Sequence, residues 1–77
     1  MPRICAELVG YNCKVCIEAP SCMKTIEVEK AVVTKCGIEA DVEALVTTAE
    51  GSILGKNTEI CSDVDVKVLR LLRGGLG

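Results

Sequence analysis

The sequence predicts a small α+β domain in which one helix packs on a mixed sheet, with the element order ββαβ(β)β. Three observations support this. Two stretches near the N-terminus alternate polar and apolar residues, as half-buried strands do. A stretch with helical spacing of apolar residues follows them, and further strand-like stretches come after it. The length of 77 residues fits one domain, and a sheet with one apolar face needs a second layer to cover it.

The first two strands are predicted to form a hairpin. Residues 3–9 place Ile4, Ala6 and Leu8 on one face and Cys5, Glu7 and Val9 on the other. Residues 13–19 likewise place Cys13, Val15, Ile17 and Ala19 on one face and Lys14, Cys16 and Glu18 on the other. A turn at residues 10–12, which contains a glycine and an asparagine, joins the two strands.

A helix is predicted next, beginning near Ser21 or Thr25, either of which could cap it, and ending at about Cys36. Its apolar stripe consists of Val28, Ala31, Val32 and Cys36. Gly37 is a suitable residue to end the helix, because glycine readily takes the left-handed conformation found there.

The second half of the chain is predicted to contain the remaining strands. Residues 42–48 form a third strand, residues 49–52 a turn, and residues 53–54 a short fourth strand. A loop at residues 55–57 follows, and residues 64–69 form the last strand.

Composition excludes several classes of function. The chain is 49% hydrophobic, Tyr11 is its one aromatic residue, and its net charge is −2 without a basic stripe, so nucleic-acid binding is not expected. No apolar run approaches the roughly 20 residues of a membrane span. The chain lacks histidine, a phosphate-binding glycine loop and a nucleophile motif, so neither enzymatic activity nor a cofactor is expected.

The end of the chain changes character. After the last strand, the segment Arg70-Leu71-Leu72-Arg73 mixes leucine and arginine. It is followed by Gly74 and Gly75, which have no side chains. A segment without side chains suits passage through a narrow channel in a partner, because only glycine allows such close approach of the backbone.

The segment of residues 62–69, followed by a short linker and Gly74-Gly75, resembles the ubiquitin-like sulfur carriers of the β-grasp superfamily, which serve thiamine and molybdopterin synthesis. Ubiquitin ends in a similar leucine- and arginine-rich segment and a Gly-Gly pair. The resemblance implies a β-grasp domain at residues 1–73 with a flexible tail at 74–77. It also implies that residues 3–9 and 64–69 pair in parallel at the centre of the sheet.

The same resemblance implies a function. An ATP-dependent adenylating enzyme would activate the carboxylate of Gly75, and the resulting thiocarboxylate would supply sulfur to a synthase in cofactor biosynthesis or tRNA thiolation. Gly74 would give clearance in the enzyme's channel, and Val46 would belong to an apolar docking patch. The residues expected to govern recognition of the tail are Arg70, Leu71, Leu72 and Arg73. Because the chain continues with Leu76 and Gly77, these two residues would have to be removed first.

Two alternatives remain open for the tail. In ubiquitin-like modifiers the activated glycine is joined to a lysine instead of receiving sulfur. A structural domain whose tail has no role is the other alternative, and removing residues 74–77 would then leave every partner interaction intact.

The six cysteines suggest a further alternative, a cysteine-based metal or redox module. Cys13-x-x-Cys16, with Cys22 nearby, has the spacing of such sites. On a strand, however, this spacing puts the two sulfurs on opposite faces. The chain also has no signal-peptide pattern, which favours the cytoplasm. We therefore expect six reduced, metal-free thiols, with Cys13 and Cys36 as core residues and Cys16 as a more reactive surface thiol.

Four acidic residues alternate with apolar ones in the predicted strands. We expect these residues to be solvated strand faces rather than an acid–base pair: Asp41, Glu43, Asp63 and Asp65.

Overall fold

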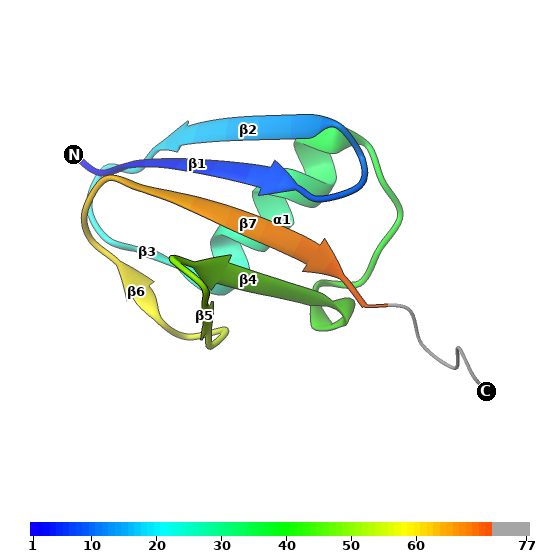
Figure 1. Cartoon of the computed structure of the whole chain (residues 1–77). Helices are drawn as coiled ribbons and strands as arrows, with labels where there is room; N and C mark the ends of the chain where they lie inside the picture. The colour runs from blue at the N-terminus through cyan, green and yellow to red at the C-terminus, as the bar shows by residue number, and fades with distance from the viewer. Residues whose placement is uncertain (72–77) are drawn as a thin grey trace.

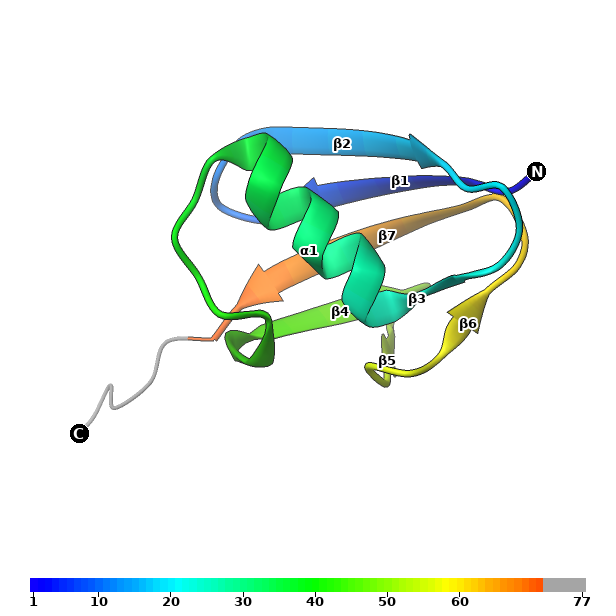
Figure 2. The ribbon, with the colours of Figure 1, turned by 180° about the vertical axis from the view of Figure 1, so that it is seen from behind.

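A computed structural model of the chain describes residues 1–71 and shows one helix lying across a mixed sheet (Figures 1 and 2). The strands of the main sheet follow the order β2-β1-β7-β4-β5. Their bounds are β1 Arg3–Leu8, β2 Cys13–Glu18, β4 Leu45–Ala49, β5 Ser52–Leu54 and β7 Val64–Arg70. The helix α1 spans Thr25–Cys36, and a short 3-10 helix η1 spans Val42–Ala44. The α+β class and the predicted packing of one helix on a mixed sheet are confirmed.

The first and last strands lie side by side and parallel at the centre of the sheet, as expected. Ile4 pairs with Val64 and Ala6 with Val66. β2 and β4 flank this pair in antiparallel orientation. Since the two ends of the described chain form the central strands, the sheet cannot be completed until nearly the whole chain is in place.

The core lies between α1 and the sheet face that it covers (Figure 2). The alternation predicted for the first two strands is confirmed, because Ile4, Ala6, Leu8 and Val15 are all buried. The other buried hydrophobic residues are Ala19, Val28, Val32, Leu45, Ile60, Val66 and Val68. This core is entirely aliphatic, so its stability comes from many small contacts rather than from a large aromatic anchor.

The helix begins at Thr25, at the second of the two predicted starts, but neither Ser21 nor Thr25 caps it. Its N-cap is Lys24, which has extended backbone, and the Lys24 N–H donates to Oε1 of Glu27 at 3.2 Å. Thr25 does not cap the helix. Its side chain is buried and its hydroxyl donates to the carbonyl of Thr58 at 3.2 Å, which ties the helix start to a loop. The end is as predicted, because Gly37 takes a left-handed φ of 68° and donates its N–H to the Val33 carbonyl.

The predicted third strand at residues 42–48 is only partly a strand. Its first three residues form η1, and β4 starts at Leu45. The reason lies elsewhere in the chain, since the Lys56 ammonium donates to the carbonyls of both Val42 and Leu45 at 2.6 Å. Those carbonyls are therefore satisfied without a strand partner.

A second, two-stranded sheet was not predicted. It pairs β3 (Met23–Lys24) with β6 (Glu59–Ile60), and each strand has only two residues. Segments this short carry no periodicity, so only the tertiary structure brings them together.

The expectation of six reduced thiols is wrong in this structure. Three disulfides join Cys5 to Cys16, Cys13 to Cys36 and Cys22 to Cys61. Cys13 and Cys16 point to opposite faces, as their spacing on a strand predicts, and do not pair with each other. Local spacing does not predict the disulfides, because each cysteine is bonded to a partner from a different element. Cys16 is consequently half of a disulfide rather than a surface thiol.

Within residues 1–71, no helix is long and apolar enough to cross a membrane.

Candidate docking face and root of the C-terminal segment

The sheet face opposite α1 is not covered by any other element of the described chain (Figures 1 and 2). Side chains on this face follow the period of two in each strand, so register places them in rows. One row consists of Cys16, Cys5 and Asp65, and another contains Glu7, Lys67 and Thr48. The face is therefore charged and disulfide-bonded over most of its length.

An apolar patch lies on the same face near the end of β7. Val46 of β4 is directly opposite Leu69 of β7, and Leu69 is 36% exposed. Val9 is 39% exposed, and its N–H donates to the Val68 carbonyl at 2.9 Å, which extends the β1–β7 pairing to this point. We call Val9, Val46 and Leu69, with Leu71 beside them, the tail-root patch. The predicted docking residue Val46 thus has an apolar partner on β7, Leu69, and lies in a row with Val9, which directly follows β1.

Two of the residues predicted to recognise partners lie at the root of the C-terminal segment. The Leu71 N–H donates to the carbonyl of Ala44, the last residue of η1, at 2.7 Å, so the chain is still held at this point, and the Leu71 side chain is 51% exposed. The Arg70 guanidinium donates to the hydroxyl of Tyr11, in the β1–β2 turn, at 2.7 Å. Arg70, Leu71 and Val46 therefore all lie near the end of β7, with Arg70 opposite Leu45 and so on the alternate face of the sheet from Val46 and Leu69.

The other predicted tail residues lie outside the described part of the chain. These are Leu72, Arg73, Gly74 and Gly75, together with Leu76 and Gly77. The proposed boundary between the domain at 1–73 and the tail at 74–77 falls in the same region and stays a prediction.

The four acidic residues are all exposed, as expected for solvated positions. Three of them do not lie on strands, because Asp41 precedes η1, Glu43 lies within it and Asp63 precedes β7. Asp63 is engaged, since its Oδ1 accepts the backbone N–H of Arg3 at 2.8 Å. Asp65 lies beside Cys5 in the parallel register.

The cysteines offer no thiolate for a metal. Among the described residues, one group of possible ligands converges, and it consists of Cys22, Glu59 and Cys61 with their ligand atoms within 4.8 Å of one another. Its two sulfurs are bonded to each other, and a metal requires the thiolate form. Cys13 and Cys16 are bonded to Cys36 and Cys5 respectively, and not to each other.

Sequence reasoning missed a buried polar network beneath the sheet. Glu29 lies on the buried side of α1, where its carboxylate accepts hydrogen bonds from Thr47 Oγ1 at 2.6 Å and from Lys56 Nζ at 2.7 Å. The predicted apolar stripe of the helix included Ala31 and not Glu29, but Ala31 is only partly buried. The one available signal was that Glu29 follows Val28 and precedes Val32 by three positions, which places it on the same helix face.

Comparison with known proteins supports the fold. No protein-family model matches the chain, and no curated protein sequence matches it either. Among solved structures, the UBL domain of Plasmodium falciparum Dsk2 is similar, with a TM-score of 0.64 and 12% sequence identity. The match covers 88% of this chain and 95% of that domain. At this identity the likeness establishes architecture alone, and the conclusion is that this chain has the ubiquitin-like β-grasp fold.

Proposed function

We propose that this chain acts as a ubiquitin-like sulfur carrier whose reacting group is the Gly75 carboxylate, freed by cleavage after that residue. The observation that carries the proposal is the position of Arg70 and Leu71, from which the C-terminal segment continues. β7 is a central strand of the sheet, and it leads through Arg70 and Leu71 directly toward Gly74-Gly75. A partner that binds the folded domain can therefore direct the C-terminal segment into the partner's own active site.

The tail-root patch supports docking at this position. An exposed apolar cluster beside a segment that must enter an enzyme is a suitable contact for that enzyme. Arg70 adds a charged group at the same place, and its hydrogen bond to Tyr11 limits the directions in which its side chain can point. The partners we propose are an ATP-dependent adenylating enzyme and a synthase that accepts the sulfur, and the chain itself is not an enzyme.

The chemistry requires little from the carrier. The Gly75 carboxylate attacks the α-phosphate of ATP and releases pyrophosphate, and a sulfur donor then displaces AMP from the acyl-adenylate. The activating enzyme supplies catalysis, and the carrier supplies a carboxylate at a defined distance from a docking surface. Residues without side chains at 74 and 75 allow the backbone to pass closely.

The second candidate is a ubiquitin-like protein modifier, which the same fold and tail would serve equally well. The two differ only after adenylation. A carrier ends as a thiocarboxylate, with one oxygen replaced by sulfur, whereas a modifier ends as an amide with a lysine of another protein. Intact-mass measurement of the protein recovered from its host separates them.

The disulfides bear on where this function would operate. Disulfides persist in oxidising compartments, and intracellular proteins of hyperthermophiles are the main exception in reducing ones. A cytoplasmic carrier, as we propose, therefore acts either in such a host or in its reduced form. Activation should be measured with both the oxidised and the reduced protein.

The test uses a form ending at Gly75 and the 77-residue chain, each mixed with ATP and an adenylating enzyme from the same host. Pyrophosphate exchange is expected with the shorter form only, because Leu76 and Gly77 displace the reacting carboxylate. A misplacement of about 1 Å can cost on the order of a hundredfold in rate. Gly75→Ala in the shorter form should lower exchange sharply.

Equal exchange by both forms would show that cleavage after Gly75 is not needed. Absence of exchange by either form, in both redox states, would remove the main support for a carrier or a modifier. A shorter form that exchanges but is recovered only as a lysine conjugate would establish the modifier.

The docking patch is tested by Val46→Asp in the form ending at Gly75. A charge at this position should weaken the contact with the activating enzyme by more than about 1.4 kcal/mol, which corresponds to at least tenfold in kcat/KM. Ile53→Asp is the matched control, since Ile53 lies on the same sheet face and is 72% exposed but belongs to β5, away from the end of β7. Equal effects of the two substitutions would argue against a specific patch.

A further inference from the structure

The Cys5–Cys16 disulfide lies on the uncovered face of the sheet, at its edge. The two cysteines are directly opposite each other in the β1–β2 register, with 4.0 Å between their Cα atoms. Cys16 is exposed and belongs to β2, an edge strand, whereas Cys5 belongs to β1 and is only partly exposed. An attacking group in solution therefore reaches the sulfur of Cys16 more readily than that of Cys5.

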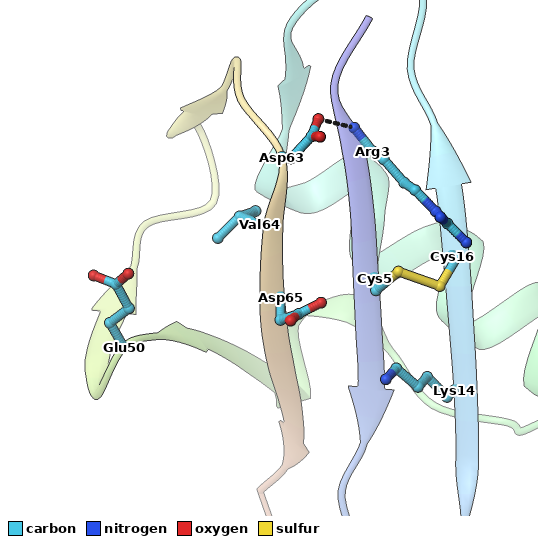
Figure 3. Close-up of a pocket in the computed structure, with 8 residues that line it drawn as sticks. All are labelled: Arg3, Cys5, Lys14, Cys16, Glu50, Asp63, Val64 and Asp65. Atoms are coloured by element: carbon cyan, nitrogen blue, oxygen red, sulfur yellow. Dashed lines mark hydrogen bonds between the residues drawn. A yellow bond between two sulfur atoms is a disulfide. The ribbon is translucent and has the colours of Figure 1, made fainter.

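Charged side chains surround this disulfide in an open hollow of about 660 Å³. Figure 3 shows Arg3 extending from β1 across to the β2 side, next to Cys16, and Lys14 extending from β2 back toward β1. Both cations line the hollow. A positive charge beside a disulfide attracts an incoming thiolate and stabilises the thiolate that leaves.

The acidic groups of the hollow favour attack at one sulfur over the other. Asp65 lies beside Cys5 in the register and in Figure 3, so its charge repels a thiolate approaching Cys5. Asp63 already accepts the backbone N–H of Arg3. Glu50 lies on the far side of β7 from the disulfide in Figure 3. Accessibility thus selects Cys16 as the site of attack, and Asp65 disfavours attack at Cys5, while each cation also faces a carboxylate in the β1–β2 register, Arg3 opposite Glu18 and Lys14 opposite Glu7.

The other two disulfides lack this combination. Cys13 and Cys36 are only partly exposed, and their disulfide joins β2 to the end of α1, on the covered side of the sheet. Cys22 and Cys61 are both exposed, but the Glu59 carboxylate lies within 4.8 Å of both sulfurs. A negative charge at that distance repels an attacking thiolate.

We propose that Cys5 and Cys16 form a reversible thiol–disulfide exchange site, which takes a thiolate as its substrate. The thiolate attacks Sγ of Cys16, the Cys5–Cys16 bond breaks, and Cys5 leaves as a thiolate. A second thiolate then attacks the external sulfur of this mixed disulfide, which forms a disulfide between the two external thiols and releases Cys16 as a thiolate. Two electrons pass from the two external thiols, which become a disulfide, to the cysteine pair, and solvent protonates the cysteines.

The fold keeps this pair ready to re-form. β1 is held by β2 on one side and by β7 on the other, so the ladder positions Cys5 opposite Cys16 without the covalent bond. The disulfide spans a sequence separation of only 11 residues within one hairpin. Breaking it frees less chain entropy than breaking either of the other two disulfides, and we expect the reduced protein to stay folded.

The experiment follows each disulfide of the oxidised 77-residue protein during reduction by limiting dithiothreitol. Samples are quenched in acid, alkylated and mapped by mass spectrometry, and backbone amide spectra report the fold. Cys5–Cys16 should open first, roughly tenfold faster than Cys22–Cys61, with the fold retained. A monothiol reagent should be trapped on Cys16 and not on Cys5.

Charge substitutions test the cause of the fast reaction. Lys14→Gln should slow the opening of Cys5–Cys16 about threefold at low salt and leave Cys22–Cys61 unchanged, since surface charges act over short distances. Asp65→Asn should accelerate the opening of Cys5–Cys16. Lys30→Gln, an exposed lysine on α1, is the matched control and should change neither rate.

Earlier opening of Cys22–Cys61, loss of the fold when Cys5–Cys16 opens, or trapping of the reagent on Cys5 would each overturn the proposal. An unchanged rate in Lys14→Gln would overturn the role of charge and, with it, the preference for this pair.

Discussion

At the scale of single residues, Glu29 and Lys56 show how one buried charge organises distant segments. The Glu29 side chain is 1% exposed and the Lys56 side chain 34% exposed. A buried carboxylate is costly unless both oxygens have partners, and here Thr47 and Lys56 supply them. Lys56 also satisfies two carbonyls around η1, so one ammonium joins the helix, the loop after β5 and the start of β4.

Lys56→Met should therefore destabilise the protein more than its surface position suggests. The substitution leaves the Glu29 carboxylate without its counter-charge and removes the Lys56 donor from the carbonyls of Val42 and Leu45, of which Val42 still accepts the Leu45 N–H, and we expect a loss of roughly 2–3 kcal/mol. Urea unfolding measures this loss, and Lys30→Met on the exposed side of α1 is the control. Adding Glu29→Gln to Lys56→Met should cost less than the sum of the two single changes, because the two residues share one network. Additive costs would show that the network is not coupled.

At the scale of elements, the end of α1 depends on one left-handed residue. Gly37 has a φ of 68°, and nothing lies within 4 Å of the position that a Cβ would occupy. The cost of any side chain at this position is therefore conformational and not steric.

Gly37→Ala should lower the free energy of unfolding by about 1–2 kcal/mol, since the left-handed conformation costs an alanine about that amount. Gly55→Ala is the matched control. Gly55 does not have a left-handed φ, and its Cβ would lie 3.4 Å from Thr58 Oγ1, an ordinary contact. The difference between the two variants in denaturant midpoints isolates the backbone effect. Equal losses of unfolding free energy in Gly37→Ala and Gly55→Ala would mean that the left-handed conformation is not the reason why Gly37 stabilises the protein.

At the scale of the whole molecule, the disulfides compensate for a small aliphatic core. A domain of this length buries a limited share of its surface, and this one has no aromatic residue in its core. The Cys13–Cys36 and Cys22–Cys61 disulfides span separations of 23 and 39 residues and connect different elements. They restrict the unfolded chain over most of its length.

Replacing Cys13 and Cys36 together by alanine should cost about 3 kcal/mol, which corresponds to a fall in Tm of roughly 12–24 °C for a domain of this size. Replacing Cys5 and Cys16 by serine should cost less, because their loop is shorter and lies within an intact hairpin ladder. Calorimetry on the oxidised proteins measures both. A larger loss for the Cys5/Cys16 pair would contradict the view that the ladder already holds these strands.

The sequence by itself determined the α+β class, the order of the main elements and the faces of the first two strands. It also determined the end of α1 at Gly37. These features follow from local periodicity and backbone preference, which act over a few neighbouring residues. The sequence also identified Val46, Arg70 and Leu71 as candidate recognition residues, through a resemblance rather than through geometry.

Only the tertiary structure decided the features that depend on partners far apart in the chain. It paired the cysteines across elements, turned the expected start of the third strand into η1, and formed the small sheet of β3 and β6. It also joined Val46 to Val9 and Leu69 in one patch. In each case the deciding contact links residues separated by many positions, and no local pattern records which distant group will supply a sulfur, an ammonium or an apolar neighbour.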